Sequence, residues 1–440
     1  MNGNPPLRTM KNTALFVSLA LVCTAACSRP STRKPVAVTF LDLEWDVQDR
    51  LPALGQDLQD FTRETGIQIK RLPGPDGSLN QLALWKSLLQ KGRGGPDVCN
   101  VDAIWSAILD PYLTDLKPYF SSGVASMDPV VVGSYTVGNR LVAMPHHAYV
   151  GVLFYRADLL HRYGFSRPPA TWDELEKMAA RIQAGERAKG EKDFWGYVWE
   201  GAEGEDLTCG GLEWQVSEGG GRIIEDDRTV SVNNPRAIRC WQRAARWVGS
   251  ISPPGVVAYG KWDAENVWSS GKAAFLRSWA SDFSIINVQT PPLHASQFGI
   301  TGMPGGSAGR VGALGGNALA VPRNSAHPKE ALEMIRYLGQ RDVELKRARE
   351  PLEPSKQMEL FELPNILAPY PKLSKSGLPG GRVVARPSIV AGLKYEDVTR
   401  AYFRTVHAVL TGEIKATAAA AALEKELVAI TGYKPGPPSN

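Results

Sequence analysis

The sequence predicts an α/β fold of two lobes, and three observations support this prediction. The chain has 440 residues, which exceeds the usual size of a single hydrophobic core, so two compact parts are expected. Strand-like apolar runs alternate with amphipathic helices, which is typical of a mainly parallel sheet covered by helices. A glycine-rich stretch late in the chain, Phe298–Pro322, has little side chain to pack and indicates a close approach of the backbone to another group.

The first part of the chain shows this alternation most clearly. Residues 36–43 (VAVTFLDL) have the apolar, β-branched composition of a strand, and further strands are expected at residues 67–69 and 98–101. Between them, apolar residues at helical spacing predict two amphipathic helices, the first of which ends at Gly66. Ligands of such sheets sit at the carboxyl ends of the strands. The residues that fall at such ends are Glu44, Trp45 and Asp102.

The second part of the chain continues with the same two kinds of element. Strands are expected at residues 141–144 and 151–155, on either side of the segment PHHAY. Thr171 followed by Glu174 forms a capping box that opens a helix, and Asn234 before a proline opens another. The further expected elements are a strand at residues 194–200 and helices at residues 207–218, 327–338, 395–410 and 417–430.

The glycine-rich stretch admits two interpretations. Residues 298–322 contain eight glycines in a pattern of strand, turn and strand. One interpretation is a plain hairpin between two core strands. The other is the floor of a ligand cleft beside Trp279, which ends the apolar run directly upstream. This stretch alone favours neither.

The N-terminus has the pattern of a targeting segment. A basic segment precedes the apolar run of residues 13–26, which is too short for a membrane span, so residues 1–26 are predicted to be a signal peptide. The ending TAAC is similar to a bacterial lipobox. Cys27 is therefore expected to carry a lipid and residues 27–35 to form a short tether. Thr24 stands where leucine is more common, so cleavage without lipidation stays an alternative.

Export would place the remaining cysteines in an oxidising compartment. These are Cys99, Cys209 and Cys240. Three cysteines allow at most one disulfide, for which Cys209 and Cys240 are the candidate pair. Buried free thiols are the alternative for each, and the spacing matches no zinc site.

Several classes of function find no support in the sequence. The formal net charge of +5 is spread along the chain without a basic run, so nucleic-acid binding is not expected. The adjacent His146 and His147 are expected to point in different directions, and adjacent residues do not have the helical spacing of a metal-binding pair. No phosphate-binding or hydrolase motif appears, and neither a metal nor a cofactor is expected. Glu44 and Asp102 could form the carboxylate pair of a glycoside hydrolase, which requires facing carboxyls about 5–10 Å apart.

The twelve tryptophans are the unusual feature of the composition. Trp85, Trp241 and Trp247 lie within helical patterns and are expected in the core, and Trp172 is expected to pack at a helix start. An indole face beside carboxylates and amides also suits a sugar ring, which stacks its C–H face and bonds through its hydroxyls. The tryptophans near predicted strand ends or loops, where this role competes with core packing, are Trp45, Trp105, Trp199, Trp214, Trp262 and Trp279.

Nine stretches together carry a family resemblance. They are DVCNVDAIW (97–105), GVLFYRADLL (151–160), RPPATWDEL (167–175), LTCGGLEW (207–214), NNPRAI (233–238), WVGSISPPGV (247–256), SGKAAFLRSW (270–279), LGGNALAVP (314–322) and ARPSIVAGLKYEDV (385–398). Through them the chain from about residue 36 to residue 430 resembles the extracellular solute-binding proteins of bacterial ABC importers. It looks most like the maltose/trehalose-type branch (family 1).

The resemblance implies a two-lobe periplasmic-binding-protein fold (type II), in which discontinuous lobes are joined by hinge strands and the ligand lies between them. The segment 311–321 would be a hinge crossing. The implied boundaries are residues 36–148 with 317–350 for the N-terminal lobe, residues 149–312 with 385–431 for the C-terminal lobe, and residues 351–384 for an irregular loop region.

The resemblance also assigns site residues one at a time. Glu44 and Asp102 look like acceptors for sugar hydroxyls. Trp279 looks like the stacking platform, and Arg386 looks like the cationic donor that clamps hydroxyls near the hinge. The resemblance implies a ligand site that comprises Glu44, Trp45, Asp102, Tyr149, Trp279, Gly316, Asn317 and Arg386.

Two positions depart from the family pattern. Tyr149 stands where an aspartate commonly precedes the GVLFY strand, and Asn317 stands where a tryptophan commonly follows the double glycine. One aromatic face and one carboxylate are therefore replaced. We expect the specificity of this protein to differ from that of its relatives at these two positions.

The function that the resemblance implies is the sugar-binding component of an ABC importer, without catalytic activity, which delivers its substrate to permease subunits and their ATPase. It would act as a monomer in the periplasm or at the cell surface, held to the membrane only by its lipid anchor. Two alternatives remain: an exported glycoside hydrolase, and a receptor or adhesin that uses the same fold without transport.

Overall fold

The computed structural model describes residues 36–42, 52–75, 78–91, 94–125, 127–280, 282, 297–340, 343 and 381–439. Several sequence predictions fall outside these residues: the signal peptide, Cys27 with its tether, Glu44, Trp45, and most of the loop region 351–384. Within the described residues, no helix has both the length and the apolar character needed to cross a membrane.

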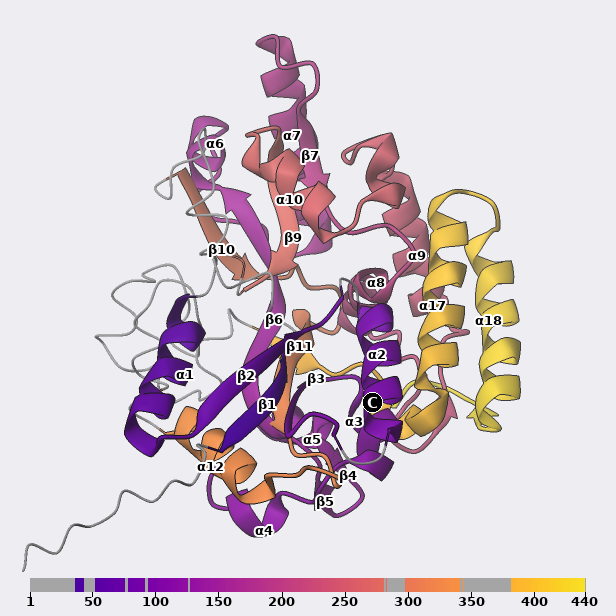
Figure 1. Cartoon of the computed structure of the whole chain (residues 1–440). Helices are drawn as coiled ribbons and strands as arrows, with labels where there is room; N and C mark the ends of the chain where they lie inside the picture. The colour runs from indigo at the N-terminus through magenta and orange to yellow at the C-terminus, as the bar shows by residue number, and fades with distance from the viewer. Residues whose placement is uncertain are drawn as a thin grey trace, which may run out of the picture. The chain divides into compact units, whose positions relative to one another are not determined.

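The first part of the chain folds as the alternation predicts. Strand β1 (Ala37–Asp42) pairs in parallel with β2 (Gln68–Pro73) and with β3 (Val98–Asp102). Helices α1 (Pro52–Thr65) and α2 (Ser78–Gln90) connect these strands (Figure 1). β1 and β3 are largely buried, which is typical of a parallel sheet covered on both faces. β2 is the edge strand, and the side chains of residues 68–72 are exposed or partly exposed.

Two long strands continue the same sheet into the second part of the chain. β6 (Met144–Arg156) and β11 (Val311–Ala320) are antiparallel neighbours, and the sheet order is β2-β1-β3-β11-β6-β9-β7. The predicted break at PHHAY is wrong, because these residues lie within β6. Pairing with β11 on that segment holds the backbone extended through Pro145. Of the predicted strand 141–144, only Leu141 and Met144 lie in strands, at the ends of β5 and β6.

The far half of β6 has a different set of partners. β9 (Ala273–Trp279) and β10 (Phe298–Gly302) both pair with it in antiparallel fashion, and β7 (Trp195–Val198) pairs with β9 in parallel. β12 (Arg382–Val384) pairs in parallel with the start of β11. The two strands of the glycine-rich stretch therefore pair with β6 and not with each other, so the plain-hairpin interpretation is wrong.

Helices cover the sheet where the sequence predicts them, and their caps are those expected. Thr171 Oγ1 accepts from the Glu174 amide at 3.2 Å, and Asn234 Oδ1 accepts from the amides of Arg236 and Ala237. α17 and α18 lie side by side (Figure 1). The longer helices are α7 (Trp172–Ala188), α8 (Glu205–Ser217), α9 (Pro235–Trp247), α10 (Lys261–Ser269), α12 (Pro328–Leu338), α17 (Tyr395–Leu410) and α18 (Ala416–Thr431).

Short elements complete the described part of the chain. They are α3 (Ser106–Leu109), α4 (Lys117–Phe120), α5 (Pro129–Ser134), β4 (Thr136–Val137), β5 (Arg140–Leu141), α6 (Ala157–Arg162), β8 (Thr229–Val230), α16 (Ser388–Ala391) and β13 (Lys434–Pro435).

Most of the tryptophans are core residues. Trp85, Trp172, Trp241 and Trp247 are buried as predicted, and core packing also accounts for Trp105, Trp199 and Trp214. Ring centroids of Trp214 lie 5.2 Å from Trp199 and 5.7 Å from Trp247, both edge to face, which is a favourable aromatic geometry. Trp262 differs, because 49% of its surface is exposed.

The cysteines are buried free thiols, so the candidate disulfide is wrong. Cys99, Cys209 and Cys240 are all unpaired with one another. Cys240 Sγ lies 3.0 Å from the Ala237 carbonyl of its own helix, whereas Cys209 packs against Trp279 and Ala313. Burial raises the pKa of each thiol above its ordinary value, which disfavours the reactive thiolate.

Candidate ligand-binding site

The end of β3 brings two of the sequence-predicted residues together. Asp102 is the last residue of β3, and its partner in the register of β11 is Asn317. Asn317 also aligns with His147 of β6, and the register shifts between Asn317 and Ala318. The amide of Ile104 donates to Asp102 Oδ1 at 3.1 Å, which fixes the carboxylate at the strand end. The polar side chains of two strands therefore meet where β11 joins β3.

Arg386 joins this position from the far end of the sequence. Its Nη2 lies 3.6 Å from Asp102 Oδ1 and 3.4 Å from the Leu314 carbonyl, to which it donates. Its Nη1 donates to Glu205 Oε2 at 3.0 Å. The Tyr395 hydroxyl donates to the same oxygen of Glu205 at 2.9 Å. One buried guanidinium thus links β3, β11 and the first turn of α8.

Burial and neighbouring charges shift the pKa values of the groups in this cluster. Burial raises the pKa of the Asp102 carboxyl above its ordinary value, the Arg386 guanidinium lowers it, and the nearby Glu205 raises it. Burial also raises the pKa of the Tyr135 hydroxyl well above its ordinary value, and the charge of Asp102 adds to this effect. The Tyr135 hydroxyl therefore stays neutral, and the charges of both Asp102 and Arg386 act on it.

Two aromatic rings, one from β6 and one from β9, lie beside Gly315 of β11. Tyr149 and Trp279 meet edge to face with their ring centroids 5.4 Å apart. Gly315 lies opposite Tyr149 in the register. A Cβ at Gly315 would stand 2.3 Å from Tyr149 Cε2 and 2.9 Å from Trp279 Cζ3. The rings therefore occupy the space that a side chain at this position would need.

Gly316 is required for a second reason. Its φ of +138° lies in the range that side chains rarely adopt, and a Cβ would stand 2.3 Å from the His147 carbonyl oxygen. Its own carbonyl accepts from the Ala103 amide at 3.0 Å. The close backbone approach that the glycine-rich stretch indicates is thus made to β6 and to the segment after β3.

A second buried charge cluster lies behind Trp279. The guanidinium carbon of Arg277 is 4.2 Å from the Trp279 ring centroid. Arg277 bonds both oxygens of Glu213 and approaches Glu200 at 3.3 Å. Glu213 Oε1 also accepts from the Ala313 amide at 3.0 Å. Burial raises the pKa of Glu200 to about 8, although Arg277 opposes the shift.

The structure brings Asp102, Asn317 and Arg386 into one cluster and Tyr149 with Trp279 into a second. Trp279 is only 7% exposed, so most of its surface packs against protein. Sequence reasoning missed Glu205, Tyr395, Tyr135, Arg277 and Glu213. Three of them, Glu213, Arg277 and Tyr395, lie in stretches that carry the family resemblance, which is the signal that could have found them. Glu205 is an acidic residue at a helix start, which is a common capping feature and carries no functional signal alone.

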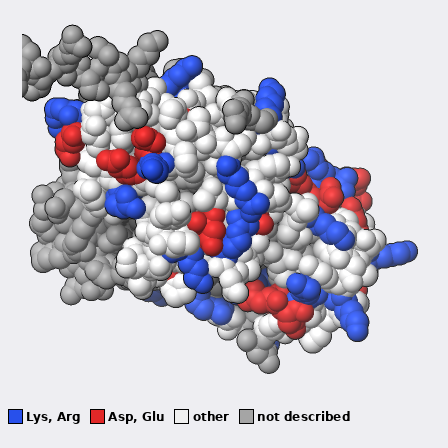
Figure 2. All heavy atoms as spheres, turned by 60° about the horizontal axis from the view of Figure 1, so that its bottom comes forward, with Lys and Arg blue, Asp and Glu red and all other residues white. Residues whose placement is uncertain are grey.

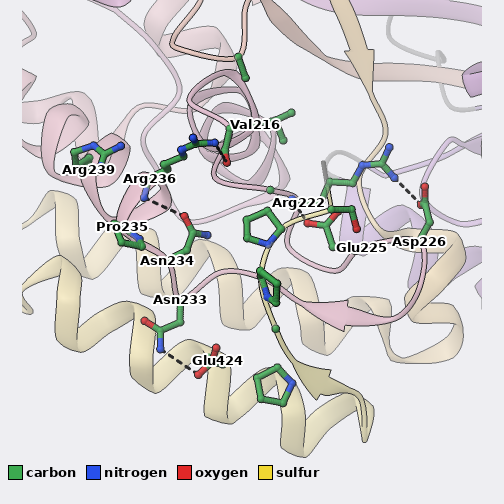
Figure 3. A pocket seen from close by; sticks show the side chains of 18 of the residues that line it. Val216, Arg222, Glu225, Asp226, Asn233, Asn234, Pro235, Arg236, Arg239 and Glu424 are labelled. Carbon is green, nitrogen blue, oxygen red and sulfur yellow. Dashed lines mark hydrogen bonds and ion pairs between the residues drawn. The ribbon is translucent and has the colours of Figure 1, made fainter.

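Basic and acidic side chains are interspersed on the face that Figure 2 shows, and the described residues contain no group of three or more potential metal ligands. A depression of about 1150 Å³ lies between the start of α9 and residues 435–439. Figure 3 shows its side chains bonding one another, as in the pairs Arg222–Asp226 and Asn233–Glu424. None of the site residues above lines it.

Comparisons with known proteins agree on the class. Residues 45–344 match the family model described as bacterial extracellular solute-binding protein. A probable ABC transporter-binding protein of Deinococcus radiodurans is 36% identical over 374 residues, which cover 84% of this chain and 89% of that protein. Maltose-bound MalE3 of T. maritima is 29% identical with a TM-score of 0.79, over 89% of this chain and 99% of that chain.

The fold has further solved counterparts. The GacH receptor of Streptomyces glaucescens, solved unliganded and with acarbose, has a TM-score of 0.78 over 91% of this chain and 100% of that chain. At 21% identity this likeness concerns the fold alone. The two-lobe periplasmic-binding-protein fold expected from the sequence is confirmed.

Proposed function

Because the chain belongs to the bacterial extracellular solute-binding protein family, we propose that it is the substrate-binding component of an ABC importer for a di- or oligosaccharide. The ligand binds between the lobes, and the loaded protein delivers it to the permease subunits and their ATPase. The protein performs no chemistry on its ligand. We keep the lobe boundaries that are expected from the sequence. In the sheet, β11 pairs with β3 and β6, and β6 pairs with β11, β9 and β10, so these two long strands connect the two parts of the sheet.

One observation carries the sugar assignment: acidic, amide and cationic side chains come together beside an aromatic pair where β11 lies between β3 and β6. Asp102 accepts, Arg386 donates, and Asn317 can do both. A sugar hydroxyl is itself donor and acceptor, so it can bond all three types. Tyr149 and Trp279 add an apolar wall for the C–H face of a ring.

Unused hydrogen-bonding capacity in the same cluster supports a polar ligand. Among the described residues, Arg386 Nε, Glu205 Oε1 and the Tyr135 hydroxyl are buried and make no hydrogen bond. Buried polar atoms without a partner are costly. A ligand rich in hydroxyls would offset this cost by bonding to these atoms when the lobes rearrange around it. Ligand binding would thereby shift the population from one arrangement of the lobes to the other, as expected of a two-state binding protein.

The proposed location follows from the family and the N-terminal sequence. Members of an extracellular solute-binding family act outside the cytoplasm. We assign Cys27 as the lipidated residue, so the protein would be anchored at the periplasmic or outer surface of a membrane and act as a monomer. Cys27→Ser should release the protein into the soluble fraction, and membrane retention of this variant would contradict the assignment.

A thermal-shift screen of the purified chain against mono-, di- and oligosaccharides tests the function. A ligand at 100 times its Kd stabilises a protein by about 2.7 kcal/mol, which gives a visible rise in Tm. Calorimetry on the best sugar should then give saturable binding of one molecule per chain. Product formation from that sugar would favour the glycoside hydrolase. No stabilisation by any sugar would contradict the carbohydrate assignment.

A further inference from the structure

The arginine two positions before Trp279 lies over the ring of that tryptophan. Arg277 and Trp279 both belong to β9 (Ala273–Trp279), and side chains two residues apart in a strand lie on the same face of the sheet. The guanidinium carbon of Arg277 stands 4.2 Å from the centroid of the Trp279 ring. An indole attracts such a cation, most strongly where water is excluded. Arg277 therefore covers one face of the indole, and a ligand can meet only the other face or the edge.

Glu213 prevents the guanidinium from turning away from this ring. Arg277 Nη2 donates to Glu213 Oε1 at 2.8 Å, and Arg277 Nε donates to Glu213 Oε2 at 3.2 Å. A bidentate pair of this kind fixes the plane of the guanidinium. Both side chains are buried, with 2% of the Arg277 side chain and 0% of the Glu213 side chain exposed. Because Glu213 belongs to α8, this helix sets the position of the cation over Trp279.

The same carboxylate also holds β11 beside the ring. Glu213 Oε1 accepts from the Ala313 amide at 3.0 Å. A Cβ at Gly315, two residues further along β11, would stand 2.9 Å from Trp279 Cζ3. The Arg277 guanidinium and the backbone at Gly315 therefore both confine the indole, and Glu213 is bonded to the guanidinium and to the strand.

β6 leaves space for this pair at a single glycine. Gly151 is the register partner of Trp279. A Cβ at Gly151 would stand 1.9 Å from Glu213 Oε1 and 2.8 Å from Arg277 Nη2. The φ of Gly151 is not positive, so its backbone conformation does not require glycine. The glycine is needed for the space that the Glu213–Arg277 pair fills.

We propose that Arg277 and Glu213 are positioning residues of the sugar site: Glu213 holds the Arg277 guanidinium, and the guanidinium fixes the Trp279 indole in the orientation that meets the ligand. This inference rests on the proposed function and deepens it, because it names the residues that set the affinity of that site. A ring that is already fixed loses little conformational freedom when a ligand binds. Loosening the indole should therefore weaken sugar binding, although neither charged residue needs to touch the sugar.

Calorimetry on the mature protein distinguishes this role from a purely structural one. The probe is whichever of glucose, maltose, trehalose, cellobiose and maltotriose stabilises the wild type most in a thermal-shift screen. We expect Arg277→Met to weaken the binding of this sugar about tenfold, which corresponds to about 1.4 kcal/mol. In a Trp279→Ala background the same change should weaken binding by less than about twofold, because the ring on which Arg277 acts is gone. Arg277→Lys keeps the cation but loses the bidentate bond, so it should recover part of the affinity.

Two further variants keep the test decisive if the stranded Glu213 carboxylate prevents Arg277→Met from folding. Arg277→Met combined with Glu213→Gln removes both charges, and the amide oxygen of glutamine can still accept from Ala313. We expect the same loss of about tenfold in this double variant. Gly151→Ala removes no charge and displaces the pair by the space of one methyl group. We expect it to weaken binding at least about threefold.

Arg156 provides the matched control, because it is also a buried arginine of the sheet. It bonds both oxygens of Asp158 at 2.8 and 2.7 Å, and it lies five residues beyond Gly151 on β6, which is about 17 Å along the strand. Arg156→Met should lower Tm and leave the affinity within about twofold of the wild type.

The outcomes separate this inference from the function on which it rests. Wild-type affinity in Arg277→Met, in its double variant with Glu213→Gln or in Gly151→Ala would show that the pair serves the fold alone. Losses that multiply in the Trp279→Ala background would show that Arg277 acts independently of the ring, and an equal loss in Arg156→Met would make the effect a general one. Each of these results refutes the positioning role and leaves sugar binding intact. A wild-type protein that binds none of the five sugars would overturn the proposed function as well.

Discussion

The sharpest test of the site is the replacement of Arg386 by glutamine. This change removes the guanidinium that lies 3.0 Å from Glu205 and 3.6 Å from Asp102. Two carboxylates are then left in a buried place without a counter-ion, and removing one partner of a buried ion pair costs about 3–5 kcal/mol. The change in Tm is this loss divided by the unfolding entropy of the whole folded chain. At about 2.1 cal/mol/K per residue, the expected fall in Tm is about 4–6 °C.

The same variant should lose ligand affinity, because Arg386 also supplies a donor to the proposed sugar site. We expect at least a tenfold weaker Kd by calorimetry, which is about 1.4 kcal/mol. Replacing Glu205 by glutamine in the Arg386→Gln background should recover part of the stability, since one of the stranded charges disappears. That second change should not recover the affinity.

A control variant gives the baseline. Arg404 forms an exposed pair with Glu426 at 2.9 Å, and such pairs contribute about 0–1 kcal/mol. Arg404→Gln should therefore leave both Tm and affinity nearly unchanged. An Arg386→Gln protein that melts like the Arg404 variant would refute the stabilising role of the cluster. Unchanged sugar affinity in Arg386→Gln would refute its role in the site.

Three further predictions concern the aromatic pair and the buried acid behind it. Trp279→Ala should weaken sugar binding at least tenfold, and calorimetry together with an unchanged far-UV circular dichroism spectrum would check this. Gly315→Ala should force the Tyr149 ring away and lower Tm. At Gly249 an added Cβ would meet nothing within 4 Å, but φ is +75°, so Gly249→Ala measures the effect of backbone strain alone. Glu200 has a folded pKa of about 8 against about 4.3 in the unfolded chain, so the folded state binds the extra proton between these values. Stability should therefore fall as pH rises from 5 to 8, and thermal melts of Glu200→Gln should show a flatter dependence.

The helices and parallel strands could be predicted because their signals are local. The run 36–43 is β-branched and apolar. The caps at Thr171 and Asn234 predict their helices from residues that lie no more than four positions away. Each of these features is decided by neighbours in the sequence. The same local rules misplaced a break at residues 145–149, because a proline and two adjacent histidines have the composition of a turn. Pairing with β11, far away in the sequence, holds that segment extended.

The site was only partly predictable for the same reason. Asp102 and Asn317 could be named from their positions, but their alignment depends on the register of β3 and β11. Glu205 and Arg386 are 181 positions apart, and neither residue carries a local signal for the other. The cysteines show the opposite error. Three cysteines in an exported chain allow one disulfide, for which Cys209 and Cys240 were the candidate pair, yet these two thiols pack into different surroundings.

The contacts of α8 give the glycine pair in β11 a physical explanation. Glu213 of this helix accepts from the Ala313 amide, and Glu205 of the same helix holds the Arg386 guanidinium that donates to the Leu314 carbonyl. Two adjacent residues of β11 are thus fastened to α8 through separate charged clusters. From Asn317 onward, β11 pairs with β3 instead. Residues 315 and 316 lie between these two anchorages, beside the Tyr149 ring and the β6 backbone. A side chain at residue 315 would meet the Tyr149 ring and one at residue 316 would meet the His147 carbonyl, both on β6. Glycine is therefore needed where β11, held by α8 on one side of these residues and by β3 on the other, lies closest to β6.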